Sequence, residues 1–294
     1  MKATCSLVRL IALCLAGPGA VCVYSATPQY TFSSVDVPAE LGAFTSAYGI
    51  NNAGVLVGNF VTVDGKLDGF LLQKGLFTDV IVPGVASDDR GALNDVNDLG
   101  QAVGAFADGE TGIVHSFVRS KGGGFTVLQD VPDVVLTEAT AINNVGDIVG
   151  FFFDAGFIPH GFILRGGVYT PYDYPGSTRT LLTRINDRGQ ITGIRRDPDA
   201  HRRGFVLQDG VTTTIDVPGS RNTRTHGINN LGQIVGYYDD AALISHGFLL
   251  KDGVYTTIDF PGASDTALLD INDRGVISGT YDGFNRGLVA TPAK

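Results

Sequence analysis

A nine-residue segment, Ile228 to Gly236, recurs along the whole chain and constrains the fold more than any other feature. Its core is Asn-[Asn/Asp]-x-Gly, with a second glycine four residues after the first. The first asparagine of each copy is separated from the next by 46, 46, 43, 43 and 43 residues. These asparagines are Asn51, Asn97, Asn143, Asn186, Asn229 and Asn272. A period in the forties with strand-like content is typical of β-propeller blades.

Between the copies, Val, Ile, Thr, Phe and Tyr alternate with clusters of Gly, Asp and Asn, which is the pattern of many short strands. The content of 40 glycines, no tryptophan and 17% charged residues agrees with a β-rich protein. In the fifth copy we expect strands over 223–228, 233–238, 247–251 and 254–259. Tight turns join the first two and the last two of these strands, and longer loops make the other connections. Each period therefore predicts one four-stranded blade.

The two ends of the chain predict how the blades are assembled. The repeat region begins with a lone fourth strand, Tyr30–Asp36, and finishes with a lone third strand, Arg286–Ala290. Every strand type occurs six times only if these two ends share a blade. Such sharing also leaves no strand edge exposed between the ends. We therefore expect an all-β fold, a six-bladed β-propeller of four-stranded blades, closed by the N-terminal strand pairing with the C-terminal strand.

Residues 1–26 have the features of a secretory signal peptide. Lys2 and Arg9 precede a short apolar run from Leu10 to Ala16, and small residues follow. All three cysteines lie in this segment, so the mature protein would have no disulfide and no thiolate metal site. Its removal takes two positive charges and no acidic ones, which changes the net charge from −9 to −11.

The remaining residues, 27–294, are expected to form a single domain without a membrane span. The sequence predicts a secreted monomer, located outside the cell, in the periplasm or at the cell envelope. A strongly acidic protein is a poor partner for nucleic acid or for anionic membrane surfaces. No P-loop, dinucleotide fingerprint, nucleophile elbow or zinc-protease helix is present, and no cofactor is expected.

Two recurring motifs resemble a known family. The tripeptide His-Gly-Phe occurs at His160 and His246, and His-Ser-Phe occurs at His115. Together with the Ile-Asn-x-x-Gly-x-Ile-Val-Gly element, these motifs resemble the HAF repeats of exported bacterial proteins. The resemblance covers residues 27–294 and implies an extracellular, periplasmic or envelope location. It implies no particular activity.

Three sets of repeated polar residues have structural explanations that we prefer to functional ones. The Asn-[Asn/Asp]-x-Gly turns have too few oxygen ligands for a dedicated calcium loop, so we expect turns without metal. The aspartates of a recurring Asp-x-Pro motif, such as Asp216 and Asp259, are expected to cap the turn that follows. His115, His160 and His246 occupy one repeat position on different blades, where they cannot converge on one metal ion.

Positively charged residues that break the repeat gather between the third and fifth copies. By the alternation of short and long connections, they are expected to share the long-loop face of the propeller. Loops on a rigid scaffold commonly carry function. The candidate ligand-binding residues are Arg179, Arg195, Arg196, His201, Arg202, Arg203, Arg221 and Arg224. The alternative is that these are solvated side chains paired with Asp197, Asp199 and nearby acids.

These observations favour a secreted binding or interaction module over an enzyme. The expected partner is an anionic polysaccharide or an envelope protein, recognised by the long-loop face. The alternative is a carbohydrate-active or lactonase-like enzyme, a lyase or hydrolase with a site at the mouth of the channel. The residues that such a site would use are Asp95, Glu138, Arg184, His226 and Asp270.

Overall fold

The computed structural model describes residues 30–83, 91–131 and 134–293. The predicted signal peptide, with the three cysteines, lies outside these residues. Every helix or strand in the described part of the chain is a β-strand. The strands are β1 (Tyr30–Val35), β2 (Gly42–Ile50), β3 (Leu56–Thr62), β4 (Leu67–Gln73), β5 (Leu76–Val80), β6 (Ala92–Val96), β7 (Ala102–Ala107), β8 (Val114–Arg119), β9 (Phe125–Val127), β10 (Leu136–Ile142), β11 (Ile148–Phe153), β12 (Pro159–Arg165), β13 (Val168–Tyr172), β14 (Thr180–Ile185), β15 (Ile191–Arg196), β16 (Arg202–Gln208), β17 (Val211–Ile215), β18 (Asn222–Ile228), β19 (Ile234–Asp239), β20 (Ser245–Lys251), β21 (Val254–Thr257), β22 (Thr266–Ile271), β23 (Ile277–Tyr281) and β24 (Arg286–Pro292).

Consecutive strands pair antiparallel in groups of four, which we call blades. Separate sheets are formed by β2–β5, by β14–β17, by β18–β21, and by β22–β24 together with β1. The groups β6–β9 and β10–β13 follow the same order, and a parallel pairing of Leu136 with Val114 joins them into one eight-stranded sheet. The expected all-β class and the four-stranded antiparallel organisation are therefore confirmed.

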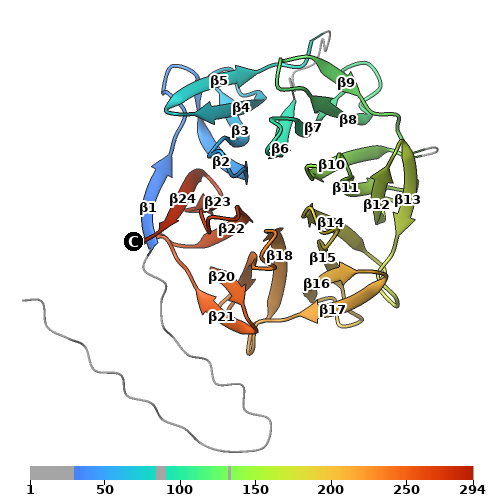
Figure 1. The fold of residues 1–294 in the computed structure, drawn as a ribbon, viewed down its shortest axis with the longest axis vertical. Helices are drawn as coiled ribbons and strands as arrows, with labels where there is room; N and C mark the ends of the chain where they lie inside the picture. The colour runs from blue at the N-terminus through green and yellow to red at the C-terminus, as the bar shows by residue number, and fades with distance from the viewer. Residues whose placement is uncertain (1–29, 84–90, 132–133, 294) are drawn as a thin grey trace, which may run out of the picture.

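The blades surround a common axis, and β2, β6, β10, β14, β18 and β22 are the strands nearest to it (Figure 1). Each of these inner strands contacts the next one, and β22 contacts β2. At the outer edge of that last blade, β1 pairs with β24 from Tyr30 opposite Pro292 to Val35 opposite Gly287. The first described strand thus lies beside the last strand of the chain.

The core of each blade is a large apolar side chain on its third strand. These side chains are Phe70, Phe117, Phe162, Phe205, Phe248 and Leu288, all at most 1% exposed. A glycine on the second strand lies directly opposite each of them, as Gly236 lies opposite Phe248. A Cβ on Gly236 would be 2.0 Å from the carbonyl oxygen of Arg224 and 2.9 Å from the Phe248 ring. The repeated position is therefore glycine because the third-strand side chain and the inner strand occupy the space that a Cβ would need.

Replacing Gly236 with Ala should lower the free energy of unfolding by at least about 1–3 kcal/mol, because the new methyl group overlaps backbone that cannot move freely. Gly122→Ala is the control, since Gly122 is exposed and its nearest heavy atom would be 4.0 Å from a new Cβ. The control should change stability by less than about 0.5 kcal/mol. Urea unfolding of both variants measures the difference, and equal midpoints would contradict the close approach at Gly236.

Candidate functional site

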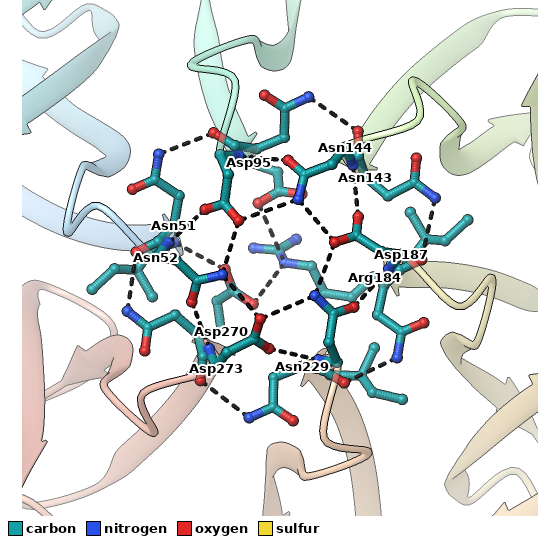
Figure 2. A pocket seen from close by; sticks show the side chains of 18 of the residues that line it. Asn51, Asn52, Asp95, Asn143, Asn144, Arg184, Asp187, Asn229, Asp270 and Asp273 are labelled. Carbon is teal, nitrogen blue, oxygen red and sulfur yellow. Dashed lines mark hydrogen bonds and ion pairs between the residues drawn. The ribbon is translucent and has the colours of Figure 1, made fainter.

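The tight turns meet at one end of the axis and line a cavity of about 70 Å³ (Figure 2). The first asparagine of each turn is only 3–5% exposed. Its Oδ1 accepts a backbone hydrogen bond within its own turn, as from Val55 N to Asn51 at 2.9 Å. Its Nδ2 donates to the backbone carbonyl of the equivalent asparagine in the next turn. These donations run from Asn51 to Asn97, Asn143, Asn186, Asn229 and Asn272, and then back to Asn51.

The second residue of the turns forms another ring, in which amides and carboxylates alternate. Its members are Asn52, Asp98, Asn144, Asp187, Asn230 and Asp273. Each asparagine Nδ2 donates to the carboxylates on both sides, as Asn52 does to Asp98 at 2.8 Å and to Asp273 at 3.0 Å. Each backbone N–H donates to the side-chain oxygen of the next member. An amide supplies two donors and a carboxylate only acceptors, so the alternation matches donors to acceptors.

These two rings are scaffold, since their polar groups bond to one another. From the sequence we expected these residues only to form their own turns. The structure shows that they also form hydrogen bonds between turns. The alternation of Asn and Asp at every second copy was the signal in the sequence for those bonds. Among the described residues, no group of three or more His, Cys, Asp or Glu side chains is placed to hold a metal ion.

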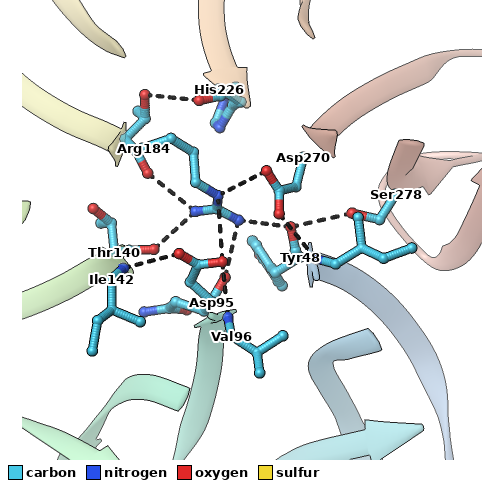
Figure 3. Close-up of polar contacts among 12 residues, drawn as sticks. Tyr48, Asp95, Val96, Thr140, Ile142, Arg184, His226, Asp270 and Ser278 are labelled. Atoms are coloured by element: carbon cyan, nitrogen blue, oxygen red, sulfur yellow. Dashed lines mark hydrogen bonds and ion pairs between the residues drawn. The ribbon is translucent and has the colours of Figure 1, made fainter. Parts of the chain in front are cut away.

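Arg184 of β14 crosses the axis at the same cavity (Figure 3). Its Nη1 donates to Thr140 O of β10 at 2.8 Å. Its Nη2 donates to Tyr48 O of β2 at 2.7 Å and to Asn94 O of β6 at 3.0 Å. Backbone carbonyls on several sides of the axis therefore bind one guanidinium. The side chain thus links four inner strands, β2, β6, β10 and its own β14, at the turn end of the axis.

Two buried carboxylates complete the charge cluster. The Nε of Arg184 lies 3.4 Å from Asp270 Oδ1 and 3.9 Å from Asp95 Oδ1. Asp270 also accepts from Ile50 N at 2.9 Å, and Asp95 accepts from Ile142 N at 2.9 Å. A shift in strand register precedes Asp95, Arg184 and Asp270 alike and brings each to the axis. Burial raises the pKa of Asp95 to about 6, although the positive charge of Arg184 opposes the shift.

Two more residues of the enzyme alternative also lie along the inner strands. Burial raises the pKa of Glu138, whose Oε1 accepts from Asn94 Nδ2 at 3.1 Å. Burial, followed by the positive charges of Arg184 and Arg224, lowers the pKa of His226 to about 3, so its imidazole is neutral at physiological pH. The expected position of these groups near the axis therefore holds. Arg184, Asp95 and Asp270 are paired with each other or hydrogen-bonded to backbone.

The predicted arginines come together in a groove of about 400 Å³ on the long-loop end. We call it the arginine groove. It is lined by Arg179, Arg195, Arg196, Arg202 and Arg224, by His226 and Tyr237, and by the apolar side chains of Phe153, Pro159, Leu181 and Ile194. Residues from three consecutive blades therefore meet in one cavity, as the alternation of short and long connections predicts.

The positive charges of the groove are compensated unequally. Arg224 forms two parallel hydrogen bonds with Asp239, at 2.9 and 3.0 Å. Arg195 stacks over the ring of Tyr174 at 4.5 Å, and Arg196 donates to the carbonyl of Ala200. Within the described part of the chain, no ion pair joins Arg179, Arg195, Arg196 or Arg202 to a carboxylate. The alternative of arginines paired with neighbouring acids therefore applies to Arg224 and not to these four.

The other three candidate residues lie outside the lining of the groove. Arg203 pairs with Asp197 at 3.5 Å and with Asp216 at 3.3 Å. His201 lies 3.9 Å from the same Asp197. Arg221 is exposed, and its backbone carbonyl accepts a hydrogen bond from Arg203. Arg203 thus stabilises the loop next to the groove.

We did not expect Tyr237 in the lining of the groove, or Tyr174 beneath Arg195, from the sequence. A comparison of equivalent positions in the six copies of the repeat could have identified this part of the site. Arg195 stands where the other copies have Phe or Tyr, as at Phe152 and Tyr238. Tyr237 lies at a repeat position where the other copies have Asn, Ala, Phe, Ile and Thr, so the fold does not require one residue type there.

The repeated histidines pair with the Asp-x-Pro aspartates of their own blades. With the two arginines at the same repeat position, the pairs are His115–Asp130, His160–Asp173, Arg203–Asp216, His246–Asp259 and Arg286–Asp36, at 2.7–3.3 Å. The blade with Asp68 at the histidine position has Ile81 in place of the aspartate. The expected turn-capping role of the aspartates was therefore incomplete, because they also link the third and fourth strands.

Comparison with known proteins places the fold and nothing finer. No family model and no curated protein sequence matches the chain. A virginiamycin B lyase from Staphylococcus aureus superposes with a TM-score of 0.51 at 14% identity, over 90% of this chain and 99% of the lyase. The fucose-recognising lectin of Aleuria aurantia, a six-bladed β-propeller, gives 0.53 at 12% identity, over 86% and 93% of the two chains.

A third similar structure is TolB from Acinetobacter baumannii, with a TM-score of 0.54 at 10% identity, over 76% of this chain and 60% of TolB. At these identities the likeness concerns the fold alone. The chain has a β-propeller-like fold. That fold is shared by binding proteins and by a lyase. In the described residues, no helix is long and apolar enough to cross a membrane.

Replacing Arg184 with Met should lower the free energy of unfolding by about 3–5 kcal/mol at pH 7.5, because Asp95 and Asp270 would remain as buried, uncompensated carboxylates. The loss should shrink as the pH falls. The folded-state pKa of Asp95 is raised, so the carboxyl is neutral below about pH 6 and becomes a buried charge above it. Urea unfolding between pH 4.5 and 7.5 measures this dependence.

The matched control is the triple variant Arg184→Met, Asp95→Asn and Asp270→Asn, which removes all three charges together. It should be more stable than Arg184→Met alone at pH 7.5. A loss that is the same at every pH, with no recovery in the triple variant, would contradict the charge-compensation role.

Proposed function

We propose that the protein is an exported, closed six-bladed β-propeller that binds an anionic ligand in the arginine groove. The single observation that carries the binding site is the set of four arginines around one cavity that form no ion pair with a carboxylate of residues 30–83, 91–131 and 134–293. In a chain of net charge −9, such a local excess of positive charge attracts anions. Guanidinium groups bind carboxylate, sulfate and phosphate oxygens through paired N–H donors.

Closure of the propeller is supported by two sets of contacts. The antiparallel pairing of β1 with β24 joins the ends of the described chain in one sheet. The asparagine amides at the axis form hydrogen bonds that return to their starting residue. An unclosed array would leave one of these amides and one sheet edge without a partner.

Export and family membership belong to the same proposal. Export is supported by the signal-peptide pattern of residues 1–26, and the HAF-repeat family by the His-Gly-Phe and Ile-Asn-x-x-Gly motifs. The partner in this setting is an acidic polysaccharide or an envelope component. Binding is preferred to catalysis because Arg184, Asp95 and Asp270 compensate one another.

The double variant Arg179→Gln and Arg202→Gln should bind acidic oligosaccharides at least about tenfold more weakly, since each arginine supplies charge-assisted hydrogen bonds. Calorimetric titration with oligogalacturonides and heparin-derived oligosaccharides, against neutral cello-oligosaccharides, tests this expectation. The affinity of the natural chain should also fall as salt is added.

The matched control is Arg188→Gln with Arg274→Gln, which removes the same charge from exposed turns at the opposite end of the axis. It should bind like the natural chain. Equal affinities in both double variants would refute the arginine groove as the binding site.

A further inference from the structure

The arginine groove is lined by two chemically different sets of polar residues. Arg179, Arg195, Arg196 and Arg202 form no ion pair with a carboxylate of the described residues, and they lie on β15, at the start of β16 and just before β14. Tyr237, His226 and Arg224 line the same groove from β18 and β19. Arg224 is paired there with Asp239, and the His226 imidazole carries no charge. Burial raises the pKa of the Tyr237 phenol, and the positive charges of Arg224 and Arg202 reach Tyr237 and oppose the rise, so one ligand can contact both sets of residues.

The Tyr237 ring is held rigidly from several sides. The imidazole of His226 stacks on it, with the ring centroids 5.4 Å apart and the planes 16° from parallel. The guanidinium of Arg224 lies 4.8 Å from its centroid, and Phe284 meets it edge-on at 5.6 Å. Such packing fixes the hydroxyl in space before any ligand binds, which lowers the entropic cost of binding.

The Tyr237 hydroxyl has no hydrogen-bond partner among the described residues, nor is it one of the fully buried polar atoms without a partner. Burial raises the pKa of the phenol, so the hydroxyl keeps its proton and can both donate and accept. The apolar side chains of Leu181, Ile194 and Phe153 line the same groove. A hydroxyl beside an apolar wall fits a neutral ring that carries its own hydroxyl groups.

We propose that the arginine groove binds a sugar acid, whose carboxylate contacts the arginines and whose hydroxyl-bearing ring contacts Tyr237. This inference rests on the proposed function and sharpens it to the class of uronic-acid saccharides. A peptide is the less suitable ligand, because β15 and β19 in the walls of the groove are paired on both sides. The open edges of β14 and β18 face the neighbouring inner strands at the axis, so neither edge offers an open side to the backbone of an extended peptide.

The test compares two ligands with three carboxylates each, trigalacturonate and a tri-glutamate peptide that is acetylated and amidated. Tyr237→Phe removes only the hydroxyl. It should weaken binding of trigalacturonate about tenfold and change the weaker binding of the peptide by less than about twofold, since the sugar ring has hydroxyls in fixed positions for Tyr237 and the flexible peptide has none. Calorimetry on the full folded chain measures both affinities.

Tyr238→Phe is the matched control. Tyr238 is the next residue along the strand, and its hydroxyl bonds to Thr257 at 3.0 Å outside the groove. The control should bind both ligands like the natural chain.

Saccharide binding should also stay constant between pH 5.5 and 8, because the His226 imidazole is neutral over this whole range. The titratable and charged groups that face His226 are Arg184, Arg224 and Tyr237.

The outcomes separate this inference from the proposed function. If Arg179→Gln with Arg202→Gln binds both ligands like the natural chain, the arginine groove is not the anion site and both proposals fail. If that variant loses both ligands but Tyr237→Phe does not discriminate between them, only the sugar-acid inference is overturned. Tighter binding of the tri-glutamate peptide than of trigalacturonate would overturn it as well.

Discussion

The buried amide of the first turn asparagine is the interaction on which the architecture depends. Its oxygen fixes the local turn, and its nitrogen bonds the backbone of the next turn. One side chain therefore joins local geometry to the assembly of blades. A buried amide without its partners costs about 1–3 kcal/mol, so a chain with six such amides is strongly biased toward the arrangement that satisfies them all. The alternating Asn and Asp ring supports the same arrangement with charge-assisted bonds.

Arg184 is the second interaction that joins the blades at the turn end of the axis. Its guanidinium takes backbone carbonyls from several inner strands and lies between Asp95 and Asp270. A charge cluster of this kind is costly to bury but fixes the mutual position of the strands that supply it. Arg184 lines the cavity of the polar rings and does not line the arginine groove.

The arginine groove shows how a repeat protein makes one site that is not repeated. The second-strand Gly, the first turn Asn and the core Phe recur in nearly every copy, because close packing and burial at those positions allow little else. Residues that differ from the other copies, such as Arg195 and Tyr237, line the arginine groove. Among the described residues, the groove gathers four arginines that pair with no carboxylate, and it is therefore the candidate site.

The sequence by itself determined the all-β class, the four-stranded groups and the pairing of the first strand with the last. It also predicted one shared face for eight residues, of which the structure places five in one groove. It did so because these features follow from period, turn chemistry and the alternation of connections, which are local. The bonds between turns, the Arg184 cluster and the division of compensated from uncompensated arginines were decided by the tertiary structure. Those features join residues from different copies, and whether Asp239 or Asp197 reaches a given guanidinium depends on strand register and on distances across the axis, which no spacing along the chain encodes.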